Sequence, residues 1–274
     1  LALAGARPQH GSRTEVVSRR GIDVVVCLDV SKSMLARDVQ PSRIERAKAE
    51  LVRLLEEEPG DRVGVVLFAG ETMEYPLTTD HEAALRFFRD AHPWDFPVQG
   101  TSIGRALVAA RDLLRRDPLA ARRSKVILLI TDGEDLEGDP VAAAREAAGD
   151  GIAVYIDAIG SAAPEPIPAF TNDGRMVGYE RDSHGDVKHT QFTPAMEQQL
   201  RQVAQEGNGA YFRPRTGEVG IDAVRRRLAQ LRRAEIAETQ KTLYEELVLP
   251  VLIPAFILLV VASVLVPERV RRKP

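Results

Sequence analysis

The stretch that decides the fold is residues 21–33, GIDVVVCLDVSKS. Its first part, residues 22–28, is a continuous apolar run rich in β-branched side chains, which is typical of a strand buried on both faces. Three oxygen-bearing side chains follow at every second position, Asp29, Ser31 and Ser33. In open α/β sheets, ligands bind at the carboxyl ends of the strands. The sequence therefore predicts a strand that delivers three oxygen donors to a ligand-binding edge.

The pattern Asp29-x-Ser31-x-Ser33 resembles the first loop of the metal-ion-dependent adhesion site of von Willebrand factor A domains. That site also takes a threonine from a second loop and an aspartate from a third. This sequence offers Thr101 in Gly-Thr-Ser and Asp132 in Thr-Asp-Gly-Glu-Asp, in the same order. The resemblance covers roughly residues 20–233. The sequences around the motifs resemble those of the membrane-anchored bacterial branch of the family, the Bat (Bacteroides aerotolerance) proteins. These stretches are LDVSKSMLARDV, PGDRVGVVLFAG, ITDGEDLEGD and GNGAYFR.

Two carboxylates and three hydroxyls, with no imidazole or thiolate, form a hard, all-oxygen set that suits Mg²⁺, Mn²⁺ or Ca²⁺ rather than Zn²⁺ or Cu²⁺. Under the resemblance, Ser31 and Ser33 bind the ion directly, and Asp29 and Asp132 bind it directly or through water. Thr101 completes or leaves the shell as the site changes state. The resemblance further implies that a partner protein supplies an Asp or Glu carboxylate in place of a bound water. In the alternative without a metal, Ser31 or Ser33 caps a helix and Asp132 closes a glycine turn.

Three neighbouring side chains have less specific roles. Lys32 lies inside the motif, and alternation along the chain points it away from the site. Glu134 and Asp135 follow Asp132 and are either solvated acids or groups that support the site from outside. We expect the solvated arrangement for both acids, which leaves the five-residue oxygen set as the candidate site.

Strands alternate with helices along the rest of residues 20–233, which predicts parallel pairing with right-handed crossovers. We therefore expect an α/β fold with a doubly wound, mostly parallel sheet, as in von Willebrand factor A domains. One edge strand, residues 71–78, contains Pro76 and is expected to be antiparallel, since sheets accept proline at an edge. Residues 161–193 break the alternation with prolines and two glycine turns, and we interpret them as a hairpin-bearing insertion.

The flanking segments differ in composition from this domain. Residues 247–266, LVLPVLIPAFILLVVASVLV, contain no charge and span roughly 30 Å as a helix at about 1.5 Å per residue, the thickness of a bilayer core. We expect a transmembrane helix there, preceded by a connecting helix over 234–246 and followed by a basic tail over 267–274. Residues 1–19 are interpreted as a linker or as the end of a preceding membrane helix.

Composition limits the function classes. The chain has 274 residues, a formal net charge of −3 and a single cysteine, Cys27. It therefore offers no electrostatic case for binding nucleic acid, and it cannot form an internal disulfide.

Basic residues crowd just after residue 266, which by the positive-inside rule places that tail in the cytoplasm and the soluble domain in the periplasm of a bacterial inner-membrane protein. The Bat resemblance implies, as partners, other Bat-type proteins and a MoxR-type AAA+ ATPase, with a role in stress tolerance.

Enzymatic alternatives use the same sheet edge. Residues 100–104, GTSIG, match the GxSxG elbow of serine hydrolases, but the preceding residues 93–99 do not form the buried strand that such an elbow needs. A phosphatase of the haloacid-dehalogenase type would need a second acid where Ser31 stands, and no P-loop is present. A metal-assisted hydrolase would need a general base, and no His, Cys or Lys is spaced for it. A structural membrane anchor with a vestigial metal site is a further alternative. We therefore expect a binding protein and not an enzyme.

Overall fold

The computed structural model describes residues 9–13, 21–56, 61–116, 123–134, 138–171, 174–213, 220–239 and 243–246, and single short stretches at 253, 256–258 and 260–261. The chain divides into two compact units. One is Arg20–Glu235, and the other combines Leu1–Arg19 with Ile236–Pro274. All five candidate site residues belong to the first unit.

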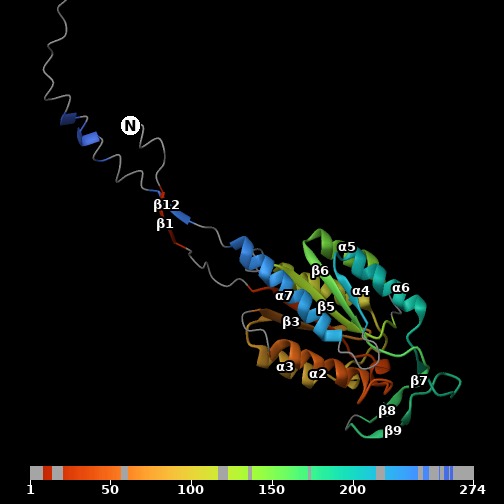
Figure 1. Ribbon diagram of the computed structural model, residues 1–274. Helices are drawn as coiled ribbons and strands as arrows, with labels where there is room; N and C mark the ends of the chain where they lie inside the picture. Colours follow the sequence, from red (N-terminus) through yellow and green to blue (C-terminus); the bar gives the residue numbers. More distant parts are fainter. Residues whose placement is uncertain are drawn as a thin grey trace, which may run out of the picture. The chain divides into compact units, whose positions relative to one another are not determined.

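The first unit is built on a six-stranded sheet (Figure 1). The outer strand β4 pairs antiparallel with its neighbour β3, and every other pair is parallel. This confirms the mostly parallel α/β sheet with one antiparallel edge strand, which carries Pro76. In spatial order the strands are β11 (Ala210–Phe212), β6 (Ile152–Ala158), β5 (Lys125–Thr131), β2 (Asp23–Asp29), β3 (Arg62–Phe68) and β4 (Thr72–Thr78).

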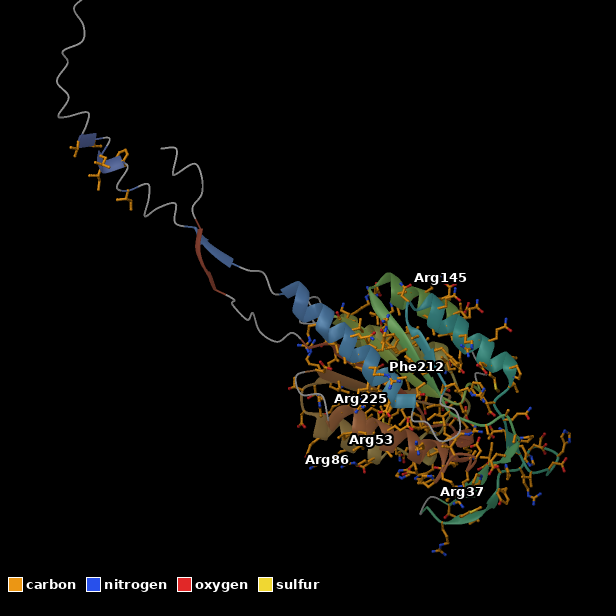
Figure 2. The ribbon with its side chains drawn as sticks, in the orientation of Figure 1. Arg37, Arg53, Arg86, Arg145, Phe212 and Arg225 are labelled. Carbon is orange, nitrogen blue, oxygen red and sulfur yellow. The ribbon has the colours of Figure 1, made fainter. Side chains whose placement is uncertain are left out.

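Helices cover both faces of the sheet (Figure 1). One apolar core contains residues of α2 (Arg43–Glu56), α3 (His81–Arg89) and α7 (Gly220–Thr239). The other contains residues of α4 (Ile103–Arg116), α5 (Pro140–Gly149) and α6 (Pro194–Glu206). The helices turn charged side chains to solvent, as Figure 2 shows for Arg53, Arg86 and Arg145. Each helix is therefore amphipathic, and its apolar stripe fixes the face that meets the sheet.

Strand β2 lies at the centre of the sheet, and all seven of its residues are buried. Val24, Val26 and Leu28 enter one core, while Val25 and Cys27 enter the other. Burial of an aliphatic side chain of this size contributes about 1.5–3 kcal/mol. Burial also raises the pKa of the Cys27 thiol, so Cys27 behaves as a small apolar residue. The central position of β2 fixes where Asp29 leaves the sheet.

The insertion between β6 and α6 forms two small antiparallel pairs, and Figure 1 shows it extending beyond the end of the sheet. Strand β7 (Glu165–Pro166) pairs with β10 (His189–Thr190), and β8 (Pro168–Phe170) pairs with β9 (Met176–Tyr179). Two one-turn 3₁₀ helices, η1 (Lys32–Leu35) and η2 (Pro93–Asp95), lie in loops of the domain.

The second unit contains a two-stranded antiparallel pair, β1 (Gln9–Arg13) with β12 (Leu243–Glu246). The sequence favoured a linker over 1–19 and a helix over 234–246, but helix α7 ends at Thr239 and a strand follows. Tyr244 favours a strand, yet the pairing joins segments more than 200 residues apart, which no local pattern reveals. Among the residues that the structure describes, no helix combines the length and apolar character needed to cross a membrane. Most of 247–266, and the tail 267–274, lie outside the described residues.

Asp157 is a buried acid in the described part of the core. Asp157 on β6 is fully buried, and among the described residues neither of its carboxylate oxygens has a hydrogen-bond partner. Burial, and then the nearby charge of Glu50, raise the pKa of Asp157 to about 8. The folded state therefore binds a proton on Asp157 that the unfolded chain releases near pH 4.

We predict that Asp157→Asn stabilises the domain increasingly as the pH rises. Between about pH 4 and about pH 8 the folded wild type holds the extra proton, so raising the pH lowers its stability, whereas Asn does not ionise. The free energy of unfolding of the variant relative to wild type should rise by up to about 1.4 kcal/mol per pH unit in this window. Urea denaturation at several pH values measures it. Asp186→Asn, at an exposed position, is the control, and an equally flat profile for both variants would contradict the prediction.

Candidate metal centre

The first loop continues directly from β2. The Val30 N–H still donates to the Phe68 carbonyl at 2.8 Å, after which the chain turns away from the sheet. The Ser31 N–H donates to Asp29 Oδ1 at 2.9 Å, and the hydroxyls of Ser31 and Ser33 share a hydrogen bond of 2.9 Å. All three predicted side chains are buried. The structure thus brings Asp29, Ser31 and Ser33 together in one turn.

The third loop leaves β5 beside it, because β2 and β5 are adjacent and parallel. Thr131 Oγ1 donates to Asp29 Oδ2 at 2.6 Å, which joins the two strand ends. Asp132 follows and is 1% exposed. Gly133 has φ +80° and its N–H donates to Thr131 Oγ1 at 3.0 Å, so the chain turns here in a conformation that favours glycine. The predicted strand-end position of Asp132 is therefore observed.

The second loop brings Thr101 to the end of β3. The Ser102 N–H donates to the Ala69 carbonyl at 3.0 Å, one residue after β3. The loop packs tightly there, since a Cβ on Gly70 would lie 2.7 Å from the Gln99 carbonyl oxygen. Thr101 is 3% exposed and precedes α4. Among the described residues, no hydrogen bond joins the Thr101 hydroxyl to the other four candidates, although Thr101 lies at the same sheet edge.

Burial and charge make this edge electrostatically unusual. Burial first, and then the charge of Asp132, raise the pKa of Asp29 to about 8, although hydrogen bonds from Thr131 and Ser31 oppose the shift. Two carboxyl groups this close and this deeply buried are stable only when protonated or paired with a cation.

Arg43, which the sequence analysis did not select, supplies one such cation. Its side chain is completely buried. One terminal nitrogen, Nη1, donates to Asp132 Oδ2 at 2.8 Å and to Thr190 Oγ1 at 3.0 Å. Nε and Nη2 donate to the two carboxylate oxygens of Asp38 at 2.8 and 2.7 Å. Burial alone would lower the pKa of Arg43, but hydrogen bonding and charge from Asp38 and Asp132 raise it.

A signal for Arg43 was available in the sequence. It is the first residue of α2, where the helix dipole disfavours a cation. The preceding Ser42 does cap the helix, with its Oγ accepting from the Glu45 N–H at 3.3 Å. An arginine in that unfavourable position indicates an acidic partner elsewhere, although the sequence does not show which acid it meets.

The acid after Gly133 is not merely solvated. Glu134 Oε1 accepts a hydrogen bond from Thr190 Oγ1 at 2.6 Å, and the Glu134 N–H donates to Asp132 Oδ1 at 3.3 Å. Burial and the charge of Asp132 raise the pKa of Glu134. Glu134 thus supports the site from outside, contrary to the solvated arrangement expected, whereas Asp135 lies outside the described residues.

The donor set fits a small divalent cation. The predicted residues supply two carboxylates and three hydroxyls; the hydroxyls of Ser31 and Ser33 are hydrogen-bonded to each other, and the Ser31 N–H donates to Asp29. Within the part of the chain that the structure describes, no three His, Cys, Asp or Glu side chains gather as a metal cluster. Hydroxyls make up three of the five donor side chains, Ser31, Ser33 and Thr101.

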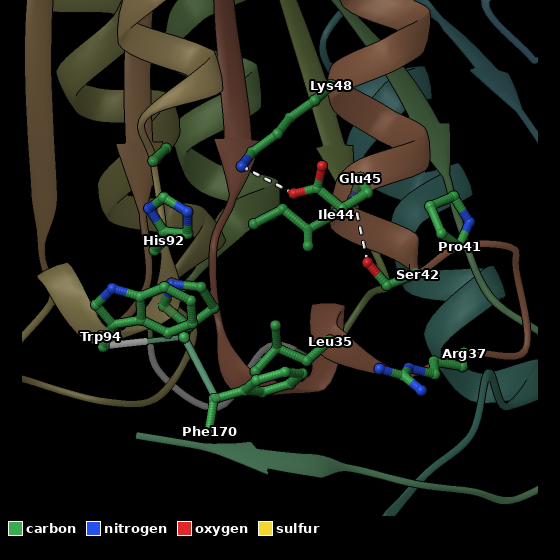
Figure 3. Close-up of a pocket in the computed structure, with 13 residues that line it drawn as sticks. Leu35, Arg37, Pro41, Ser42, Ile44, Glu45, Lys48, His92, Trp94 and Phe170 are labelled. Carbon is green, nitrogen blue, oxygen red and sulfur yellow. Dashed lines mark hydrogen bonds and ion pairs between the residues drawn. The ribbon is translucent and has the colours of Figure 1, made fainter. Parts of the chain in front are cut away.

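A cavity of about 250 Å³ lies beyond the first loop (Figure 3). Its wall includes Leu35 of η1 and the stacked rings of His92 and Trp94, whose centroids are 4.4 Å apart. Phe170 of the insertion closes one side, with its ring centroid 6.2 Å from that of Trp94. The insertion thus has an apolar contact with the domain besides its polar contacts.

The serine-hydrolase alternative lacks its structural context. Residues 93–95 form the short η2 helix, and no strand leads into residues 100–104 in this described stretch. Ser102 itself is 1% exposed. A nucleophile elbow needs a strand directly before the turn and an exposed hydroxyl. The GxSxG match is therefore a coincidence of sequence.

Comparison with known proteins agrees with this geometry. Residues 24–134 match the von Willebrand factor type A domain family. A crystal structure of the conserved hypothetical protein BatB from Bacteroides thetaiotaomicron is 35% identical, with a TM-score of 0.67, and the match covers 80% of this chain and 100% of that one. The chain is a von Willebrand factor A domain protein of the Bat family. This confirms the resemblance on which the site residues were selected.

Two further proteins are similar to this chain over most of the Bat-type domain. An aerotolerance-related membrane protein from Bacteroides fragilis is 35% identical, with a TM-score of 0.66, and the match covers 78% of this chain and 100% of that chain. A UPF0353 protein from Mycolicibacterium paratuberculosis is 26% identical over 194 residues, 65% of this chain. The chain spans 58% of the length of that curated relative.

We predict that Thr131→Val destabilises the Bat-type domain by about 1–3 kcal/mol, because it leaves a buried acceptor on Asp29 and the Gly133 N–H without their partner. Urea denaturation measures the loss. Thr72→Val, on the edge strand β4, is the matched control and should change stability by less than about 0.5 kcal/mol. Equal effects of the two substitutions would show that the Thr131 hydrogen bonds do not stabilise the site.

Proposed function

We propose that this domain binds a protein partner through a divalent metal ion held by Asp29, Ser31, Ser33, Thr101 and Asp132. The observation that carries the proposal is the convergence of three separate loops on one sheet edge, with both carboxyl groups buried there. Mg²⁺ is the preferred ion, with Mn²⁺ or Ca²⁺ as substitutes, because all five donors are oxygens.

The chemistry of the set supports binding by exchange of a ligand. Two aspartates neutralise a divalent ion, and Mg²⁺ usually keeps several waters. An Asp or Glu carboxylate of a partner would replace one of these waters. Ser31 and Ser33 would hold the ion directly, Asp29 and Asp132 directly or through water, and Thr101 in one state of the site. Each role follows from the family resemblance together with the positions above.

We infer a binding role and not an enzymatic one. Catalysis by a metal-bound water needs a general base within hydrogen-bonding reach. The nearest basic side chain at this edge is Arg43, whose guanidinium remains charged and cannot act as a base. His184 and His189 lie exposed on the insertion. Glu134 is a further acid at this edge, but its Oε1 accepts a hydrogen bond from Thr190, which disfavours a role as the general base of a metal-assisted hydrolase.

The family and the terminal sequence support a membrane setting. We propose that residues 247–266 form a helix in the bacterial inner membrane, with the domain on the periplasmic side. Partners of the proposed kind are other Bat-type proteins and a MoxR-type AAA+ ATPase, in a complex concerned with stress tolerance. One relative is described as an aerotolerance-related membrane protein, which supports this setting.

Partner capture from membranes tests the site. We expect a crosslinked partner to be recovered with wild type in Mg²⁺, and to be lost in EDTA or with Asp29→Ala. Calorimetry with Mg²⁺ and Mn²⁺ should show heat for wild type and none for Asp29→Ala. Asp139→Ala is the control, since Asp139 is an exposed acid that caps α5. Equal capture under all conditions would show that the partner binds elsewhere than at the metal site.

Thiol labelling tests the orientation. Ser183 is exposed on the insertion, while Cys27 is fully buried and is removed as Cys27→Ala to eliminate background. We expect Ser183→Cys in this background to react with a membrane-impermeant maleimide in intact spheroplasts. Protection in spheroplasts, with reaction after lysis, would place the domain in the cytoplasm instead.

A further inference from the structure

One link between the candidate metal loops and the insertion is the buried side chain of Arg43, besides the direct hydrogen bond from Thr190 to Glu134. The Arg43 guanidinium contacts Asp132 in the third loop and Thr190 in strand β10 of the insertion with the same nitrogen, Nη1. The other side of the guanidinium holds Asp38, whose Oδ2 accepts from the N–H of Ser161, at the start of the insertion, at 2.6 Å. Both ends of the insertion are therefore attached to Arg43 or to its direct partner.

The surrounding backbone is shaped around this side chain. Gly160 has φ +133°, and a Cβ built there would lie 3.1 Å from Arg43 Cζ. A larger residue at 160 would displace the guanidinium and would also be strained. Arg43 is thus closely packed between the end of β6 and the insertion.

Other contacts of the insertion do not pass through Arg43. Lys32 forms an ion pair of 2.9 Å with Glu180, and Phe170 packs near Trp94 (Figure 3). Lys32 therefore points away from the metal donors, in the direction that alternation predicts. These contacts would keep the insertion on the domain when the contact through Thr190 weakens.

A divalent cation at the predicted site would compete with Arg43. Asp132 Oδ2 accepts from Arg43, while Asp132 is also one of the two carboxylates proposed to neutralise the ion. Like charges in a poorly solvated site repel strongly, and the guanidinium cannot release its proton. An ion at Asp132 therefore weakens the Arg43–Asp132 pair and, with it, the hold of Arg43 on Thr190.

We propose that Arg43 is a positioning residue that couples ion binding at Asp132 to the placement of the insertion 161–193 through Thr190. The insertion would then respond to the state of the metal site and shape the surface that meets a partner. This inference rests on the proposed metal site. Coupling of this kind is reciprocal. Release of the insertion from Arg43 would therefore also make the metal site bind its ion more tightly.

Amide hydrogen exchange of the intact chain, followed with and without Mn²⁺, tests the coupling. In wild type we expect Mn²⁺ to speed exchange in 161–171 and 174–193 by about fivefold or more, while the central strands are unchanged. In Thr190→Val, which keeps the shape but removes the hydroxyl, Mn²⁺ should still bind but exchange in the insertion should no longer respond. Its dissociation constant for Mn²⁺ should fall relative to wild type.

Two further variants make the result decisive. Thr171→Val is the same substitution elsewhere in the insertion, at a site that does not contact Arg43, and should respond as wild type does. Arg43→Lys keeps the charge but loses the forked geometry, so it should weaken the response even if Thr190→Val folds poorly.

The possible outcomes separate the two proposals. Wild type that binds Mn²⁺ without any change in the insertion would overturn the coupling and leave the metal site intact. A Thr190→Val response equal to that of wild type would do the same. Wild type that binds no Mn²⁺ would overturn both the metal site and the coupling.

Discussion

Two carboxyl groups buried side by side, Asp29 and Asp132, set the main physical constraint on this protein. They lie at the ends of adjacent parallel strands because β2 and β5 pair in register, with Leu28 opposite Ile130. A buried pair of acids is unfavourable unless protons, hydrogen bonds or cations compensate for it. The nearby structure supplies all three: a raised pKa on Asp29, donors from Thr131 and Ser31, and the guanidinium of Arg43.

The same constraint explains why the insertion belongs to the site. Arg43 needs more acceptors than Asp132 alone provides, since a guanidinium has five donors and is completely buried here. Asp38 and Thr190 supply them, and each is tied to an end of the insertion. The polar contacts that compensate for burial of the arginine therefore also attach the insertion to the loop that carries Asp132.

Much of the fold was predictable because its strands are buried and its helices are amphipathic. The apolar runs at β2 and β5 and the apolar stripe of α2 are local patterns that report burial directly. The pairing of β1 with β12 was missed, since it depends on a contact between distant segments with weak local preferences. The site was predicted in part for the same reason: Asp29 and Asp132 follow obvious strands, whereas Arg43 looks like an ordinary residue of a charged helix.

The sequence by itself determined the strand and helix order, the oxygen-rich set at the strand ends and the resemblance to Bat-type domains, because these depend on periodicity and on short motifs. Only the tertiary structure decided which acid Arg43 meets, that Thr131 links β5 to Asp29, and that Thr190 joins the insertion to the site. These contacts connect residues 89 to 147 positions apart. Their partners are selected by the geometry of the folded sheet edge, and local sequence carries no record of that geometry.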